Sequence, residues 1–423
     1  MGFYPNDLTT PRLHFYSNAT GSSNSGGNIA HWIQLYHHSP LQRFAMLAHF
    51  ISNARFSAVV LAIVLARATS LHAQNVTATS SPIGTFTIPL AGASDNYASL
   101  PLQRTPAIAA MVQMVTESGP SAVITLTPPT TLTPSQFVYV AGTQPNTYYV
   151  QFMSGAKEGL FYTVTANGAN TLTVNANGDK TLDNVVETGD LIEVVPYWTL
   201  NTTFPNGQGL HPTTSVTAPR SQVMLPNQTT AGINLPVAAT YYYFTGDGGP
   251  AWKKVGDNSA NTYPDVVLYP DTYFIVRHPL ATADTVLTLP GGAPMSKQAI
   301  IVGNLKALTR QDNAVTMPVP EDITLATSNL YPNVISGSAS LAPTDTLLVF
   351  DPKVIGINKA ATATYFYYTG SLFGGPGWRK VGDNATIRNN DRIIAAGQGF
   401  IIRRGSRPTA GSVIWPYLPS YLQ

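Results

Sequence analysis

The chain carries one phrase of eleven residues twice, and this repetition limits what it can fold into. The phrase reads GGPAWKKVGDN at residues 248–258 and GGPGWRKVGDN at residues 374–384. Each copy follows an aromatic run, TYYYFTG at residues 240–246 and TYFYYTG at residues 364–370. Aromatic runs followed closely by Gly-Gly-Pro favour a strand followed by a turn. The sequence therefore predicts a strand–turn–strand unit that occurs twice.

The repetition extends well beyond this phrase. Thr199-Leu200 matches Thr324-Leu325, Gly232-Ile233-Asn234 matches Gly356-Ile357-Asn358, and residues 274–277 match residues 400–403, at offsets of 124 to 126 residues. A repeat of this length has the size of a domain rather than of a solenoid unit. We therefore expect two copies of a β-sandwich-like or barrel-like module, at residues 199–323 and 324–423, with linker strands at the end of the first copy.

Residues 75–198 predict a separate small β domain. Short runs of alternating polarity are separated by turn residues such as Gly119-Pro120 and Asn167-Gly168, which favour tight hairpins. Roughly five to eight such strands favour a small barrel or sandwich, and their order favours the barrel. For the stretch 107–114 the alternative is a short helix opened by Thr105-Pro106. The predicted fold class is all-β, with a small N-terminal β-barrel followed by two copies of a β module.

The composition is poor in charge and contains no cysteine. Charged residues make up 10% of the chain, against roughly 25% in ordinary soluble proteins. The absence of cysteine excludes disulfides, thiolate metal ligands and cysteine nucleophiles. A weakly charged chain that must stabilise itself by core burial is typical of exported β proteins.

The first 73 residues predict an export leader rather than part of the fold. A largely apolar run at residues 56–66 is followed by a small-residue ending suited to cleavage after Ala73. This pattern is typical of a secretory signal peptide at residues 46–73, and the run is too short to span a membrane. A buried helix is the alternative. Because such leaders are short, we expect Met46 to be the start and residues 1–45 to be an over-extended N-terminus.

Removing this leader changes the charge of the chain. Residues 1–73 hold four bases and one acid, so the remainder has 19 bases, 20 acids and a formal charge of −1. A near-neutral chain without basic clusters is a poor candidate for binding nucleic acid or anionic membranes. We expect no nucleic-acid partner, no membrane span in the mature chain, and a periplasmic, cell-surface or extracellular location.

The candidate site residues all belong to the repeated phrase and its aromatic strands. They are Trp252, Trp378, Tyr242, Phe366, Lys253, Arg379, Asp257 and Asp383. On the structural interpretation, each indole anchors the core of its module. On the functional interpretation, exposed indoles stack on sugar rings, the polar neighbours bind hydroxyl groups, and two copies add avidity. Whether the indoles face the core or the solvent decides between these interpretations.

Other residue types offer little further chemistry. After the leader only His211 and His278 remain, neither lies in a motif, and we expect His278 at the surface. The Asn- and Asp-rich segments 175–179 and 389–391 are oxygen-rich enough for Ca²⁺, but they lack the spaced carboxylates of a calcium loop and suit ordinary turns. A glycosidase with paired carboxylates stays open as an alternative, because its two acids have no fixed spacing. We expect no cofactor and no metal.

Motifs spread over most of the chain after the leader carry a family resemblance. They are residues 82–84, 99–102, 154–159, 165–172, 189–190 and 196–200, together with the repeated phrase and residues 400–404. On these motifs the chain resembles an uncharacterised family of secreted proteins from Verrucomicrobia-type bacteria. The resemblance implies an exported bacterial protein. It carries over no catalytic residues, because the matching motifs are turns and strands.

The sequence as a whole favours a secreted, non-enzymatic protein of the bacterial cell surface or extracellular matrix. The expected role is structural or adhesive, as a component of a surface layer, sheath or fibre. Expected partners are further copies of the chain or other envelope and matrix proteins. The alternative is a carbohydrate-binding protein that uses exposed Trp and Tyr of the repeated module to hold a polysaccharide, and a polysaccharide hydrolase comes third.

Overall fold

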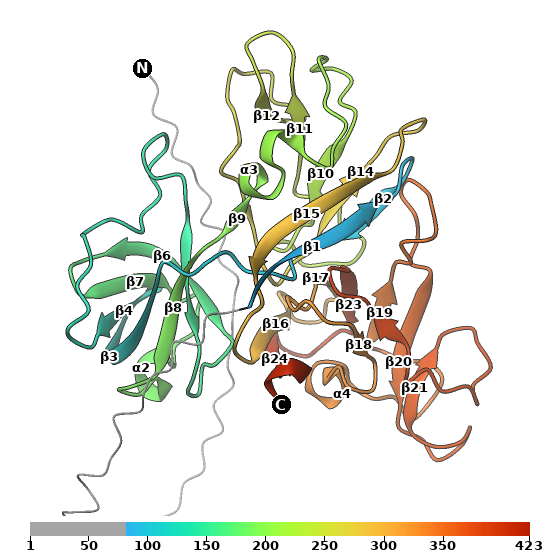
Figure 1. Ribbon diagram of the computed structural model, residues 1–423. Coiled ribbons are helices and arrows are strands. Elements are labelled where there is room, and N and C mark those ends of the chain that lie inside the picture. Colours follow the sequence, from blue (N-terminus) through green and yellow to red (C-terminus); the bar gives the residue numbers. More distant parts are fainter. Residues whose placement is uncertain (1–81) are drawn as a thin grey trace, which may run out of the picture. The chain divides into compact units, whose positions relative to one another are not determined.

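The computed structural model describes residues 82–423, so the predicted leader at residues 46–73 and the predicted over-extended segment 1–45 lie outside the described residues. The described chain consists almost entirely of strands and turns, which confirms the all-β class (Figure 1). The short helical elements of this part are α2 (Leu182–Val185), α3 (Leu200–Thr203), α4 (Leu330–Asn333), η1 (Pro205–Gly207) and η2 (Ser420–Leu422). None of the described helices is long and apolar enough to cross a bilayer.

Six strands close into a small barrel, as the sequence predicts (Figure 1). In chain order they are β3 (Ile108–Ser118), β4 (Ser121–Leu126), β5 (Tyr148–Phe152), β6 (Phe161–Asn167), β7 (Thr171–Asn175) and β8 (Leu191–Pro196). Around the barrel the order is β3-β4-β7-β6-β5-β8. Gly119, with a φ of 61°, makes the turn from β3 to β4. Alternate side chains of these strands point inward and form one hydrophobic core.

Outside the barrel, two five-stranded antiparallel sheets have the same strand order (Figure 1). The first runs β12 (Ala251–Lys254), β11 (Ala239–Phe244), β10 (Gln222–Leu225), β14 (Phe274–Arg277) and β2 (Asp95–Ala98). The second runs β21 (Gly377–Lys380), β20 (Ala363–Tyr368), β19 (Thr346–Val349), β23 (Phe400–Arg404) and β17 (Gln311–Val315). The registers correspond as well, because Tyr243 pairs with Trp252 and Tyr367 pairs with Trp378.

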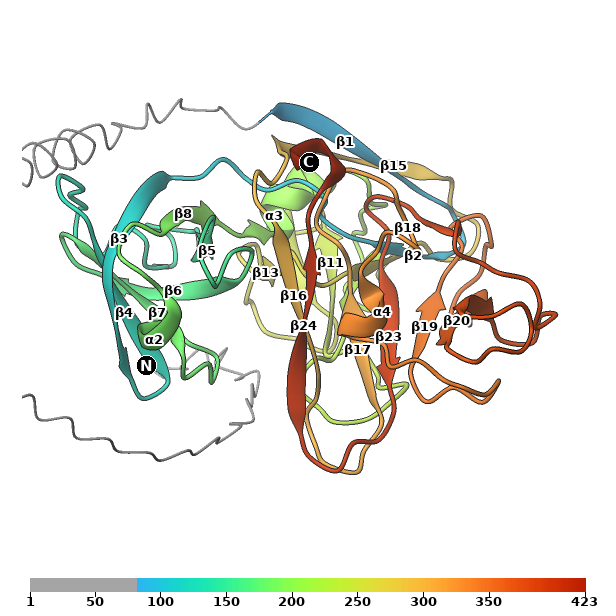
Figure 2. The same ribbon diagram turned by 90° about the horizontal axis from the view of Figure 1, so that it is seen from below.

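Smaller elements accompany each sheet in the same order. The ribbon of β1 (Ile83–Leu90) with β15 (Thr285–Gly292) corresponds to that of β16 (Gln298–Asn304) with β24 (Gly411–Tyr417) (Figure 2). The pair β9 (Trp198–Thr199) with β13 (Val267–Leu268) corresponds to β18 (Ile323–Thr324) with β22 (Ile393–Ile394). We call residues 82–103 and 197–292 the first module, and residues 298–417 the second module.

In the sequence, the barrel is an insertion in the first module rather than a domain that precedes it. The sequence places β1 and β2 in the domain at residues 75–198, but they pair with β15 and β14 of the first module. The chain leaves this module after β2, forms the barrel, and returns at β9. The predicted border between residues 323 and 324 also differs, because β16 and β17 pair with strands of the second module. Residues 108–114 belong to strand β3 and not to a helix.

Each module has its own hydrophobic core, and a further cluster joins the two sheets. The separate cores contain the two tryptophans of the repeated phrase. The joining cluster consists of Tyr97, Met224, Tyr273 and Ile275 from the first module with Ala314 and Ile401 from the second. The two sheets therefore pack against one another through apolar side chains as well as through the polar contacts described below.

Candidate functional site

The two tryptophans of the repeated phrase are buried in the cores of their modules. Trp252 is 1% exposed and Trp378 is 2% exposed. The Trp252 ring packs against Tyr243 and Phe204, with ring centroids 5.5 and 5.8 Å apart, and Trp378 packs against Tyr367 at 5.6 Å. These contacts stabilise each module by burial of aromatic surface. Neither indole presents a face on which a sugar ring could stack.

The cations of the repeated phrase bind backbone carbonyl groups of their own module. Lys253 Nζ donates to the carbonyls of Ala260 and Asn261 at 3.2 and 3.0 Å. At the matching position, Arg379 is 1% exposed. Its guanidinium donates to the carbonyls of Phe373, Gly375, Trp378 and Ala385. Both cations therefore fix the loops around the phrase.

The remaining candidates are also used within their own modules. A hydrogen bond from the Tyr263 hydroxyl lowers the pKa of Asp257 to about 2. Asp383 lies on the surface, 3.9 Å from the Lys380 ammonium. Tyr242 and Phe366 are each 3% exposed. The structure thus gives every predicted residue a place inside one module, without assembling a shared binding site from the two copies.

The polar contacts that join the two modules come from other residues. Arg277 forms a two-pronged ion pair with Asp95, with Nε to Oδ1 at 2.7 Å and Nη2 to Oδ2 at 2.8 Å. Arg277 Nη2 also donates to the side-chain oxygen of Asn358, in the second module, at 2.5 Å. The Asn358 backbone N–H donates to Asp95 at 2.7 Å. Asp95 is 2% exposed, so this charge is fully enclosed by its partners.

The second module makes the same contact with the first. Arg403 pairs with Asp312 at 2.7 and 2.9 Å and donates to Asn234 at 2.6 Å, and the Asn234 N–H donates to Asp312 at 2.8 Å. Asn358 and Asn234 have φ angles of 54° and 52°, a left-handed conformation that Asn adopts more readily than most residues. We call the sets Arg277–Asp95–Asn358 and Arg403–Asp312–Asn234 the inter-module clamps.

Sequence reasoning finds parts of these clamps but not their role. The Gly-Ile-Asn triplets and the Arg after each Phe-Ile strand are among the residues that match between the copies. Their Asp partners go unnoticed, because Asp95 falls in the predicted barrel domain and Asp312 in the predicted linker. A comparison of the β2 and β17 segments, ASDNYAS and RQDNAVT, shows the shared Asp-Asn that could have revealed the correspondence.

His278 is fully buried, so the expectation of a surface residue is wrong. Its Nδ1 lies 2.8 Å from Ser221 Oγ, and its Nε2 lies 2.8 Å from Thr285 Oγ1. The Thr285 hydroxyl donates to the Gly209 carbonyl, so it accepts from Nε2–H, which leaves Nδ1 to accept from Ser221. Burial, with the neighbouring His211 ring adding to it, lowers the pKa of His278 to about 4. The imidazole is therefore neutral and bonded at both nitrogens.

The Ser221–His278 pair is a structural arrangement rather than a nucleophilic one. A catalytic serine needs access to its substrate and a histidine oriented by a third group, usually a carboxylate. Ser221 is 1% exposed, and the far nitrogen of the imidazole meets a threonine hydroxyl. The cluster instead fastens the residue before β10 and the residue after β14 to the first residue of β15.

The buried imidazole predicts a loss of stability in mild acid. Because the pKa of His278 is about 4 when folded and about 6.5 when unfolded, stability is full above pH 6.5 and falls as the pH drops toward 4. The loss amounts to about 3 kcal/mol. The other titratable groups facing the ring are His211, which adds to the shift, and Asp284, which opposes it.

Urea titrations at pH 7, 6, 5 and 4 measure this effect. We expect the His278→Gln variant to lose clearly less stability than the unmodified chain between pH 6.5 and 4, since glutamine takes up no proton there. Carboxylates elsewhere contribute equally to both proteins, so the difference isolates the histidine. Identical pH profiles for the two proteins would contradict the assignment.

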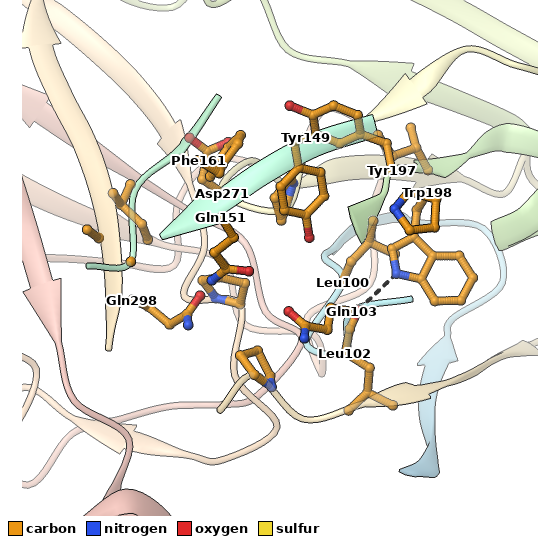
Figure 3. A pocket seen from close by; sticks show the side chains of 18 residues that line it. Leu100, Leu102, Gln103, Tyr149, Gln151, Phe161, Tyr197, Trp198, Asp271 and Gln298 are labelled. Atoms are coloured by element: carbon orange, nitrogen blue, oxygen red, sulfur yellow. Dashed lines mark hydrogen bonds between the residues drawn. The ribbon is translucent and has the colours of Figure 1, made fainter. Parts of the chain in front are cut away.

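A small cavity lies where the barrel meets both modules (Figure 3). The carboxamides of Gln103, Gln151 and Gln298 turn toward it, and the Tyr149 ring lines it. Burial raises the pKa of Glu193, which accepts a hydrogen bond from Gln103 at 3.4 Å. The cavity volume is about 20 Å³, room for one or two water molecules but too little for a sugar or a cofactor.

In each of the two segments considered for Ca²⁺, at least one side-chain oxygen accepts hydrogen bonds within the fold. Asp179 accepts from the Lys157 ammonium at 2.5 Å and from the Tyr162 hydroxyl at 2.7 Å. Asn390 Oδ1 accepts from the Trp378 N–H at 3.0 Å. Among residues 82–423, no group of three or more His, Asp or Glu side chains is placed to hold a metal ion.

No protein-family model, curated protein or solved structure matches this chain. Among the contacts above, the inter-module clamps are a polar arrangement that both copies share and that joins one module to the other.

Proposed function

We propose that this chain is a secreted, non-enzymatic structural or adhesive protein of the bacterial cell surface or extracellular matrix, a component of a surface layer, sheath or fibre. The observation that carries this proposal is the pair of inter-module clamps. They fasten two modules of like construction to one another, and the residues retained in both copies act in packing and clamping. Export by the predicted leader and membership of the secreted family that the motifs resemble are part of the same proposal.

The alternative of a carbohydrate-binding protein has less support. It depends on exposed aromatic side chains in the repeated phrase, whereas Trp252 and Trp378 are buried. The cavity beside the barrel does not replace them, because it has room for one or two water molecules. A structural role requires no such open site.

Sedimentation velocity tests the proposal. Over a series from micromolar concentrations upward, we expect the purified chain to shift from a monomer to large species, because a building block must associate with its own copies. A matched incubation with insoluble polysaccharides should leave the protein in the supernatant. A single monomeric species at every concentration, combined with retention on one polysaccharide, would instead support the carbohydrate-binding alternative.

A further inference from the structure

We infer that the face between the two modules is a self-complementary dimer interface, and that two copies of this chain pair through it by exchanging modules. This inference rests on the proposed function, because it supplies the contact by which copies associate. The partner it names is a second copy of the chain. In the exchanged dimer, the first module of each copy packs against the second module of the other copy instead of against its own second module.

Self-complementarity follows from the clamps. Each module has one Arg–Asp pair and one Gly-Ile-Asn turn. The arginine of each pair donates a hydrogen bond to the asparagine of the other module's turn. The backbone repeats the exchange, because the Asp95 N–H donates to the Gly356 carbonyl at 2.9 Å and the Asp312 N–H to the Gly232 carbonyl at 2.9 Å. In a two-fold interface, each side carries both partners of every contact, so that residue i of one side meets residue j of the other and the reverse.

The contacts nearest the centre of this face show the same relation. The Ser99 N–H donates to the Gly397 carbonyl at 3.0 Å, and the Thr316 N–H donates to the Asp271 carbonyl at 3.1 Å. Ser99 and Thr316 each lie four residues after the Asp of a clamp, and their hydroxyl oxygens are 2.7 Å apart. Equivalent residues that touch one another mark the position of a two-fold axis.

The modules can separate without breaking a sheet. Among the described strands, the named pairs of each five-stranded sheet stay inside one module, and the bridge from Ala98 to Gln398 is isolated. Residues 293–297 connect the two modules, and their release leaves the strands of each module intact. Exchange also requires the second module to leave the barrel core, against which its Ala299, Ile301 and Ile414 pack. A short connection between two such modules is the arrangement from which exchanged dimers form.

Concentration decides which pairing prevails. A connection this short gives a module and its own partner an effective concentration on the order of millimolar. Dilute chains therefore pair within themselves, and exchange becomes competitive when neighbouring chains reach similar concentrations. Such concentrations belong to a dense layer or fibre, which connects the exchange to the proposed function.

Paired cysteines at the axis test the exchange. The chain has no cysteine of its own, so in the double variant Ser99→Cys/Thr316→Cys the disulfide expected between modules joins residues 99 and 316. Oxidised while dilute, it should run as a monomer on a non-reducing gel. Oxidised after assembly at millimolar concentration, more than half of the chains should run as covalent dimers or larger species. Reduction should return all of them to monomers.

The outcomes separate this inference from the proposed function. Assemblies in which every disulfide lies within one chain would overturn the exchange and leave assembly intact, whereas monomers at every concentration would overturn both. The single variant Thr316→Cys should give no covalent dimer, because its counterpart is residue 99. A dimer from it would show second modules pairing with one another, which contradicts the exchange. If the double variant fails to fold, Ala98→Cys/Gln398→Cys tests the same face at the isolated bridge.

Discussion

Replacing Trp252 by alanine is expected to lower the free energy of unfolding by about 3–5 kcal/mol, the usual effect of truncating a fully buried tryptophan. The indole packs against Tyr243 and Phe204, so its removal leaves a cavity that these rings cannot fill without leaving their own positions. The same loss is expected for Trp378→Ala, since that indole is equally buried in the second module. Guanidinium titrations followed by circular dichroism measure both.

Two matched variants calibrate this result. Trp252→Phe should lose clearly less, because it keeps an aromatic ring and because Trp252 Nε1 makes no hydrogen bond among the described residues. Leu372→Ala, at a side chain that is 67% exposed, should stay within about 0.5 kcal/mol of the parent. A stability loss below about 1 kcal/mol in Trp252→Ala, accompanied by loss of polysaccharide binding, would contradict the core role and favour the carbohydrate-binding alternative.

Removing the carboxylate of one inter-module clamp is also expected to have a large effect. Asp312→Ala is expected to lower the free energy of unfolding by about 2–3 kcal/mol. The change leaves the Arg403 guanidinium, which is 16% exposed, without its counter-charge, and it removes the acceptor of the Asn234 N–H. The loss stays below that of a fully enclosed pair, because water reaches part of the arginine.

A double-mutant cycle shows whether the clamp acts as a unit. Asp312→Ala with Arg403→Ala should give a coupling energy of at least about 1 kcal/mol, and the cycle at Asp95 and Arg277 should agree with it. The control is Asp383→Ala, at an exposed pair with a 3.9 Å separation, which should change stability by less than about 0.5 kcal/mol. Additive effects at Asp312 and Arg403 would contradict the clamp.

Local sequence patterns indicate the strands of the barrel and the barrel itself, but not the pairing of distant strands. The turn at Gly119 joins β3 to β4, so its chemistry identifies that hairpin directly. β1 instead pairs with β15, about 200 residues later in the chain. The alternation of polar and apolar residues in β1 gives the buried face but does not name the partner. For this reason the sequence assigns β1 and β2 to the barrel domain that follows them.

The candidate site shows the same division between local and distant information. The repeat identifies the tryptophans. The strand TYYYFTG is aromatic on both faces, so the alternation of its side chains does not show which face is buried. The clamps depend on Asp95 meeting Arg277 and Asn358, and His278 depends on Ser221 and Thr285. These neighbours are brought together by tertiary structure alone.

Electron microscopy of the purified protein, concentrated from dilute solution, shows whether this chain is a building block of larger assemblies. We expect ordered assemblies, as sheets or fibres with a regular repeat. The double variant Asp95→Ala/Asp312→Ala, with both clamps broken, is expected to lose this order at the same concentration. Monodisperse particles of monomer size in every preparation of the unmodified chain would contradict the claim that this protein is a building block.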